Sequence, residues 1–452
     1  MSPEAASLTM QAAASKQPAD PTISPPNLSN SGKVEDAGIR DELAAAVDPP
    51  NYEHEIGQRL HCEWRQNETR ECEVVERRAL ANGAHEYYVH YANFNRRLDE
   101  WVSADRLSEM QPQAPMVRRG ASAEKRRKLD PVLDPAFGER PPPTAEVEEV
   151  AGELDAVTRR EHEAATRVKN INKVVLGKWE IETWYYSPFP PEYLNCDTLY
   201  FCEFDMHFVR SHAALQRYMK RSDAVHPPGN EIYRNGSISV FEVDGNRSLT
   251  YCQNLCLLAK LFLDHKNLYY DVEPFLFYVL TECDEHGCHP VAFFSKEKVS
   301  VMDYNLACIL TLPPYQRRGY GRFLIALSYE LSRLEGKAGT PERPLSDMGL
   351  VGYRSYWAQV LLRILQTHRG AISIEQLSQL SAIRIDDVMS TLQALHLIKY
   401  WKGQHMLCIS PKVLRDYVYF EQGPSCSEAS FDPSRLQWTP YHDRPPLERC
   451  LS

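Results

Sequence analysis

The sequence lacks a long apolar run and a compact cysteine framework, and each absence excludes a class of protein. The longest uninterrupted apolar run covers residues 275–280, whereas a membrane-spanning helix needs about 20 apolar residues. The 12 cysteines are scattered singly, which favours reduced thiols in a reducing compartment over a disulfide-stapled secreted scaffold. The N-terminus has no basic region followed by an apolar core, so we expect no secretory signal.

Two segments are short of aromatic residues, and we interpret both as lying outside folded domains. Residues 1–50 contain no aromatic residue and are rich in Ala, Ser and Pro, which predicts a disordered tail. Residues 111–150 have no Trp or Tyr and begin a linker that we extend to 169 through a charged, helix-like segment. The Lys-Arg-Arg-Lys cluster at residues 125–128 is either a nuclear import signal or a solvated charge run, and we favour import.

The rest of the chain, residues 51–110 and the residues from 170 onward, is long enough for two folded regions. Of the 452 residues, 43% are hydrophobic, which allows real cores, and the net charge of −10 conceals local basic clusters. Residues 51–110 are rich in aromatics and predict short strands at 60–65, 72–80, 87–92 and 100–102, with Asn82-Gly83 as a type I′ hairpin turn. The larger region begins near residue 170.

In the larger region, apolar patterning predicts a sheet with helices around it. Strands are expected at 198–203, 239–243, 275–282, 291–294 and 305–312, with Gly287 in a hairpin turn. Helices are expected at 211–221, 249–263 and 323–334, from a cap at Ser346 to residue 368, and as a pair at 373–380 and 385–397 followed by a small hairpin.

The stretch from 305 to 334 suggests a phosphate-binding turn between a strand and a helix. A buried strand ends at Pro313-Pro314, and a basic, glycine-bearing turn leads into a helix. Such a turn presents free backbone N–H groups and a positive helix end to a phosphate. No Gly-Lys-Ser/Thr follows and no acidic residue ends a second strand at the right spacing, so this is neither a Walker loop nor a dinucleotide fingerprint.

The residues of this turn resemble a known cofactor loop. Tyr315-Gln316-Arg317-Arg318-Gly319-Tyr320-Gly321 is similar to the acetyl-CoA pyrophosphate loop of the GNAT superfamily of N-acetyltransferases. The phrases at 226–234, 254–260, 307–321, 340–347 and 354–357 are similar to those of MYST histone lysine acetyltransferases, in the males-absent-on-the-first and Esa-like branch. Residues 90–102 resemble the chromo-barrel (Tudor-knot) module that precedes many MYST catalytic domains.

These resemblances imply the architecture. We expect an α/β (α+β) fold: a GNAT-like acetyltransferase with a mixed-sheet core and degenerate zinc-finger-like and winged-helix-like subdomains, preceded by a small β-barrel. The expected boundaries are a chromo-barrel at 51–110 and a MYST-type domain at 170–440, divided into 196–226 (zinc-finger-like), 227–368 (acetyl-CoA core) and 369–425 (winged-helix-like).

Acetyl transfer to lysine requires a neutral amine, and a lysine with a pKa of about 10.4 is almost entirely charged at neutral pH, so a general base is needed. The resemblance gives this role to Glu342, held between prolines; Glu330 is a competitor that helical register makes an ordinary surface residue. Cys308 matches the family's active-site cysteine. It either accepts the acetyl group or lines the pocket during direct attack, and we favour direct transfer.

The resemblance also assigns residues to the cofactor and to self-modification. The backbone of Ile309, Leu310 and Thr311 would bind the acetyl and pantetheine end of acetyl-CoA. The pyrophosphate would lie on Gln316, Arg317, Arg318, Gly319, Tyr320, Gly321 and Arg322, with further contacts from Ser346, Ser355 and Lys402. Lys266 matches the lysine that MYST enzymes acetylate on themselves; alternatively it is an exposed lysine at a helix end.

A zinc site is not expected. The family's Cys-x2-Cys-x12-His-x3-Cys positions here are Cys202, Asp205, Tyr218 and Ser222, which leaves one good ligand where a structural site needs four. His207 and His212 could substitute as ligands, but their spacing does not follow the family's pattern. We therefore expect a metal-free subdomain.

In the barrel, Trp64, Tyr88, Tyr91 and Trp101 either form a cage for methyl-lysine or belong to the core, with Arg96 and Arg97 binding RNA or nothing. We favour the core, because so small a barrel needs its aromatics inside.

We therefore expect a nuclear histone acetyltransferase that uses acetyl-CoA on lysines of the histone H4 tail in nucleosomes, within a multiprotein complex. Acidic surface would steer a basic peptide toward the site. The alternatives are an inactive chromatin-binding scaffold with this fold, to which the missing zinc ligands point, and a thiol hydrolase using Cys308, for which no persuasive histidine partner is present.

Overall fold

The computed structural model describes residues 52–64, 68–80, 82–110, 166–194, 196–264, 266, 270–368, 370, 372–401, 404–407 and 430–441. The predicted tail at 1–50, the basic cluster at 125–128, nearly all of the predicted linker and Lys402 lie outside these ranges. Of the predicted charged helix only residues 166–170 are described, and they form turns and bends.

Residues 52–110 form a five-stranded antiparallel barrel-like sheet in the order β4-β3-β2-β1-β5. Its strands are β1 (Arg59–Glu63), β2 (Thr69–Ala79), β3 (His85–Tyr91), β4 (Glu100–Ser103) and β5 (Leu107–Glu109). The sequence missed β5, which has only three residues. The predicted type I′ turn is also wrong. Only Gly83 of the Asn82-Gly83 pair has a positive φ (81°), and the hydrogen bond from Leu80 N to Ala84 O gives a longer loop.

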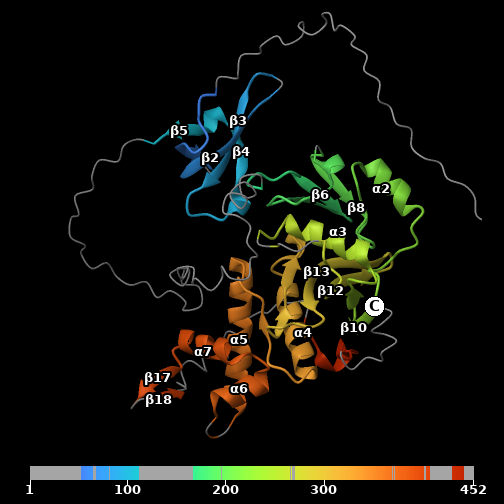
Figure 1. Cartoon of the computed structure of the whole chain (residues 1–452), viewed down its shortest axis with the longest axis vertical. Coiled ribbons are helices and arrows are strands. Elements are labelled where there is room, and N and C mark those ends of the chain that lie inside the picture. The colour runs from blue at the N-terminus through green and yellow to red at the C-terminus, as the bar shows by residue number, and fades with distance from the viewer. Residues whose placement is uncertain are drawn as a thin grey trace, which may run out of the picture. The chain divides into compact units, whose positions relative to one another are not determined.

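The second region is built on a five-stranded sheet in the order β10-β11-β12-β13-β15 (Figure 1). The strands are β10 (Asn230–Asn235), β11 (Ile238–Asp244), β12 (Phe275–Asp284), β13 (Gly287–Glu297) and β15 (Cys308–Thr311). Side chains of β12 are buried on both faces from Leu276 to Thr281, because the strand is central and helices pack on the sheet. These helices are α3 (Leu249–Lys260) and α4 (Tyr320–Leu334), and α4 contacts β13 and β15.

The predicted single strand at 305–312 is two strands in two sheets. β14 (Tyr304–Leu306) pairs in parallel with β16 (Thr340–Pro341), whereas β15 pairs antiparallel with β13. Ala307 lies between them and donates its N–H to Ser295 O at 2.8 Å. The sheet expected to be mixed is antiparallel in all its pairs, and the parallel pairs lie elsewhere, between β14 and β16 and between residues 173–176 and 198–201.

Two smaller groups of elements flank this sheet. One is the sheet β7-β6-β8-β9 with α2 (His212–Met219), which is capped by Ser211. Its strands are β6 (Lys173–Leu176), β7 (Trp179–Glu182), β8 (Thr198–Phe201) and β9 (Phe208–Val209).

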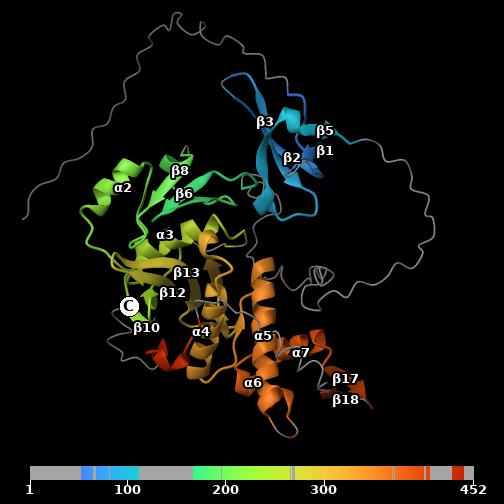
Figure 2. The same ribbon diagram turned by 180° about the vertical axis from the view of Figure 1, so that it is seen from behind.

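The other group consists of α5 (Asp347–Thr367), α6 (Ile374–Ser381), α7 (Ile385–Ala394) and the hairpin of β17 (Ile398–Trp401) and β18 (Gln404–Leu407) (Figure 2). The long helix α5 contacts α4 on the core and both α6 and α7, so it joins the winged-helix-like group to the sheet. Among the described residues, no helix is long and apolar enough to cross a bilayer.

Candidate active site

Glu342 is fixed by hydrogen bonds on both sides of its segment. Glu342 follows β16 directly, and its N–H donates to Leu306 O at 2.8 Å. Leu306 is the last residue of β14 and lies two residues before Cys308. On the other side, Gly339 N donates to Ala382 O at 2.8 Å, and Gly339 O accepts from Arg384 N at 3.1 Å. The segment is thus held between β14 and the turn that joins α6 to α7, and it brings Glu342 beside the strand that carries Cys308.

A buried carboxylate on α7 forms hydrogen bonds with residues on either side of Glu342. Asp387 is 1% exposed and accepts a hydrogen bond from Thr340 Oγ1 at 2.7 Å and one from the Arg343 guanidinium at 2.6 Å. Burial raises the pKa of Asp387, and the bonds from Thr340 and Arg343 oppose that rise. The sequence analysis missed Asp387 because its role depends on contacts that only the fold creates. Its presence in the first turn of α7 carried no distinguishing signal.

Lys266 lies next to Cys308, and their side chains form a hydrogen bond. Burial alone would lower the pKa of Lys266, but charge interactions with Cys308 and Cys256 and hydrogen bonds to both sulfurs raise it. Lys266 is half-buried, so the alternative of an exposed helix-end lysine is wrong. Cys256 on α3 was also missed. Its thiol is buried, which raises its pKa to about 11 against the influence of Lys266.

The two acids of the site are both shifted towards their protonated forms. Burial raises the pKa of Cys308, Lys266 opposes the rise, and Glu342 adds to it. Partial burial of the Glu342 carboxyl raises its pKa as well. Glu297 adds to that rise, and Lys266 opposes it. Glu342 as a whole residue is exposed, so only its carboxyl is partly shielded from water. A carboxylate with a raised pKa is a stronger base, and a protonated thiol is a poor nucleophile.

The predicted pyrophosphate loop has exposed cations around a helix N-terminus. Gly319 caps α4 with φ 96°, and the first turn of α4 contains no acidic residue. Arg317, Arg318 and Arg322 are exposed. This arrangement of free N–H groups and guanidiniums suits an anionic phosphate.

Two other residues of this loop shape it. Gln316 Nε2 donates to Thr311 O at 3.1 Å, which joins the loop to the end of β15. The Tyr320 ring is buried, and its hydroxyl donates to Glu282 on β12. Only the backbone of Tyr320 is therefore placed to contact a phosphate.

The remaining predicted cofactor residues lie on β15 and α5. Ile309, Leu310 and Thr311 belong to β15, which is the last strand of the described sheet and pairs with β13 on one side. Its other edge pairs with no described strand, so backbone groups there can bind a ligand, except Thr311 O, which accepts from Gln316. Ser346 caps α5 by accepting from Gly349 N at 3.1 Å, and Ser355 is exposed on the same helix.

The positions that would hold zinc make a different set of contacts. Tyr218 Oη donates to Asp205, and the ring of Tyr218 stacks on His207 with centroids 4.2 Å apart. Cys202 is buried in a small cluster with Phe204 and Leu215. One thiol and a carboxylate already bound by a tyrosine do not make a tetrahedral zinc site. Within the described residues, no group of three or more His, Cys, Asp or Glu could hold a metal ion.

The barrel aromatics do not assemble into one cage. Tyr88 and Tyr91 are each 1% exposed, and the rings form separate pairs, Trp64 with Tyr91 at 5.8 Å and Tyr88 with Trp101 at 5.3 Å. Positions 88 and 91 of a strand face opposite sides. The guanidinium of Arg78 lies 4.2 Å from the Trp101 ring centre, so that ring already has a cation.

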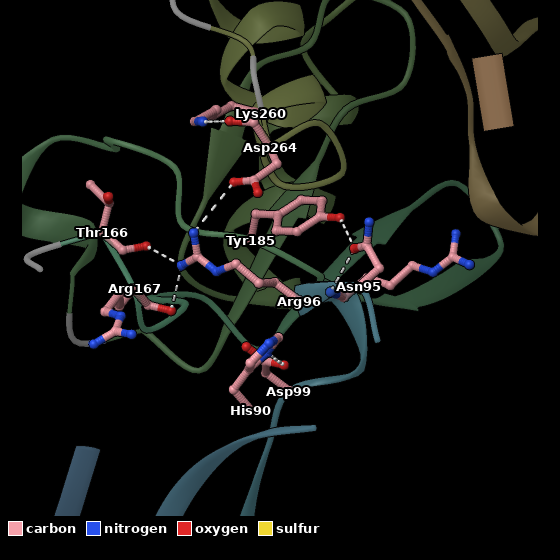
Figure 3. A network of polar contacts seen from close by, with 10 residues as sticks. His90, Asn95, Arg96, Asp99, Thr166, Arg167, Tyr185, Lys260 and Asp264 are labelled. Carbon is pink, nitrogen blue, oxygen red and sulfur yellow. Dashed lines mark hydrogen bonds and ion pairs between the residues drawn. The ribbon is translucent and has the colours of Figure 1, made fainter. Parts of the chain in front are cut away.

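Arg96, offered above as an RNA contact, binds within the chain (Figure 3). Its guanidinium donates to the carbonyls of Thr166 at 3.4 Å and Arg167 at 3.0 Å, and it lies 3.8 Å from the carboxylate of Asp264. Asp264 O also accepts from Lys260 Nζ at 2.5 Å. Arg96 thereby contacts the segment that leads to Lys266.

Three family descriptions match the chain. They are the MOZ/SAS family over residues 226–435, the RNA binding activity-knot of a chromodomain over 54–109, and the MYST family zinc finger domain over 168–221.

Similar proteins cover most of the chain. Histone acetyltransferase of the MYST family 2 from Arabidopsis thaliana is 53% identical over 86% of this chain and 86% of its own length. A putative MYST-like histone acetyltransferase 1 from Oryza sativa is 51% identical over 90% and 89%. Histone acetyltransferase ESA1 of Kluyveromyces lactis is 43% identical over 78% and 86%. The chain accordingly belongs to the MYST family of histone acetyltransferases, which are lysine acetyltransferases.

Proposed function

We propose that this enzyme transfers the acetyl group of acetyl-CoA to lysine side chains of the histone H4 N-terminal tail, with Glu342 as general base. The observation that carries the proposal is the fixed position of Glu342 beside the strand of Cys308, with a pKa raised by partial burial and by Glu297. A base of this kind supplies the neutral amine that the reaction requires.

The transfer is direct. Glu342 takes a proton from the substrate ammonium, the neutral amine attacks the thioester carbon, the C–N bond forms and the C–S bond breaks. The CoA thiolate leaves and takes up the second proton lost by the nitrogen. Burial raises the pKa of Cys308, which disfavours a thiolate nucleophile, so Cys308 lines the site and contributes without carrying the acetyl group.

The acetyl-CoA lies along the edge of β15 and the start of α4. Backbone groups of Ile309, Leu310 and Thr311 bind its acetyl and pantetheine end, and the loop from Gln316 to Arg322 binds its pyrophosphate. Ser346, Ser355 and Lys402 add contacts. Lys266 is the site of self-acetylation.

The enzyme acts in the nucleus on nucleosomes as part of a multiprotein complex. We also infer that the finger-like subdomain folds without zinc, because Asp205 and Tyr218 satisfy each other where metal ligands would stand.

The test is transfer of labelled acetyl from acetyl-CoA to an H4 tail peptide by the wild type and Glu342→Gln. We expect the variant to lose a factor of about 100 or more in kcat, the range typical of a lost general base. Glu330→Gln is the matched control, since Glu330 on α4 pairs with Arg333. Equal loss in both variants, or full activity of Glu342→Gln across pH, would reject Glu342 as the base.

A further inference from the structure

Two thiols face each other at the end of the β12–β13 hairpin. Cys283 and Cys288 are directly opposed in the antiparallel register, and their sulfur atoms are 3.0 Å apart. Cys283 is half-buried and Cys288 is 9% exposed. Neither residue belongs to the acetyl-transfer site described above.

The backbone geometry of this pair already suits a disulfide. Cys283 N donates away from β13, to Ser237 O at 2.6 Å, and Cys288 N donates away from β12, to Val225 O at 2.8 Å. The two residues therefore form a non-hydrogen-bonded pair, whose Cα atoms are about 4.5 Å apart in an antiparallel ladder. Disulfides form between Cα atoms about 4.4–6.8 Å apart, so closure needs movement of the side chains but not of the strands.

Cys283 and Cys288 differ in their exposure and in their local environment. Burial and the hydrogen bond from Cys283 raise the pKa of Cys288 to about 12, and the nearby Arg234 opposes this rise. Cys283 is the more accessible sulfur and is placed to react first with a small oxidant. Its buried neighbour is then within reach to resolve the product.

We propose that Cys283 and Cys288 form a reversible disulfide when the protein meets a peroxide, and that this disulfide regulates cofactor binding. The Cys283 sulfur attacks a peroxide oxygen, the O–O bond breaks, and a sulfenic acid and water form. The Cys288 sulfur then attacks the Cys283 sulfur, the S–S bond forms, and the S–O bond breaks to release a second water. Two thiols lose two protons and two electrons in all, and the peroxide accepts them. In a reducing compartment the bond is transient.

The hairpin connects this pair to the cofactor loop. Glu282, next to Cys283, accepts the hydrogen bond from Tyr320, the first residue of α4. Closing the sulfurs from 3.0 Å to a bond of about 2.05 Å requires the Cys283 side chain, directly beside Glu282, to turn towards Cys288. The shift cannot be absorbed on the other side, because Gly287 is so tightly packed that a Cβ there would lie 2.3 Å from Val225 O.

The regulatory part rests on the proposed acetyl-CoA site, so the disulfide is tested first and without activity. The reduced full-length protein is treated with hydrogen peroxide, alkylated, and digested for mass spectrometry without reductant. We expect a peptide containing both residues to lose two hydrogens, to escape alkylation at both sulfurs, and to recover with dithiothreitol. Cys196→Ser, which changes another half-buried thiol, should behave as wild type, and Cys283→Ser should lose the product. Only sulfinic acid at Cys283, or a disulfide to another cysteine, would overturn the proposal.

The second measurement is binding of CoA by calorimetry to the reduced and oxidised proteins. We expect the oxidised wild type to bind at least threefold more weakly and Cys283→Ser to show no change on oxidation. Weakening that persists in Cys283→Ser would instead come from another thiol such as Cys308 and would contradict the regulatory link. Unchanged affinity in a protein whose disulfide has formed would also reject that link. Failure of the reduced protein to bind CoA at all would refute the proposed function and leave the disulfide result standing.

Discussion

At the scale of single residues, Lys266 is the cation that counteracts the effect of burial on the acids of the site. It opposes the rise in pKa of both Glu342 and Cys308, and acetylation would remove its charge. Without that charge the Glu342 carboxyl holds its proton to higher pH.

Lys266→Gln should therefore move the acidic limb of the pH–rate profile to higher pH, because activity is lost as the pH falls through the pKa of Glu342. At a pH within this limb we expect a loss of severalfold in kcat, with near wild-type rates above it. Lys266→Arg keeps the charge and should keep the limb. A limb that moves equally in both variants, or in neither, would show that the charge of Lys266 does not act on Glu342.

At the scale of elements, the winged-helix-like group binds the segment that carries Glu342. Asp387 on α7 binds Thr340 and Arg343 on either side of Glu342, and the α6–α7 turn binds Gly339. Helix α7 thus positions the proposed base.

The variant Asp387→Asn tests whether Asp387 positions Glu342 or stabilises the fold as a whole. Arg343 is 58% exposed and can return to water, and burial disfavours the Asp387 charge, so we expect a change in unfolding free energy of about 1 kcal/mol or less. The base loses an anchor, so kcat should fall about tenfold while KM for acetyl-CoA stays the same. Thr391→Ser on α7, which keeps the hydroxyl bonded to Asp387 O, is the control. A fall in Tm together with the rate would show that Asp387 acts on the fold as a whole.

The finger-like elements give a prediction about metal. Because Tyr218 and Asp205 bind each other, chelator should leave Tm unchanged, whereas Tyr218→Phe should cost about 1 kcal/mol of unfolding free energy. Thermal unfolding with and without chelator, together with elemental analysis of the purified protein, decides the matter. One zinc per chain, or a Tm that falls on chelation, would contradict the metal-free subdomain.

Sequence patterns predicted most elements but not the contacts that make the site. The strands of β11, β12 and β13 and the cap at Ser346 follow from apolar period and capping chemistry, which are local. The division of 305–312 into β14 and β15 could not be read locally, because it depends on β16 pairing from more than thirty residues further along. Asp387 and Cys256 were missed for the same reason. Glu342 was found through family resemblance, since a glutamate between prolines has no distinctive periodicity.

At the scale of the whole molecule, the barrel and the catalytic region share a polar contact through Arg96. The guanidinium binds the carbonyls of Thr166 and Arg167 and approaches Asp264 (Figure 3). The contact is two residues from Lys266, so the barrel touches the segment that carries the proposed acetylation site.

Arg96→Ala should raise backbone hydrogen exchange at residues 166–170 and 260–266 by severalfold, because it removes the donor that ties them together. Its neighbour Arg97 is exposed, so Arg97→Ala is the matched control. Exchange that rises equally in both variants, or a change confined to the barrel strands, would show that Arg96 does not couple the two regions.

The way Glu342 is anchored also constrains how the chain acquires activity as it folds. Residues 339–343 form hydrogen bonds with Leu306, Ala382 and Asp387, and all three partners are distant in sequence. Contacts between distant segments close late, since the loops between them must be ordered first. We therefore expect Glu342 to reach its position after the sheet and its helices have formed, so that a newly made chain folds before it becomes active.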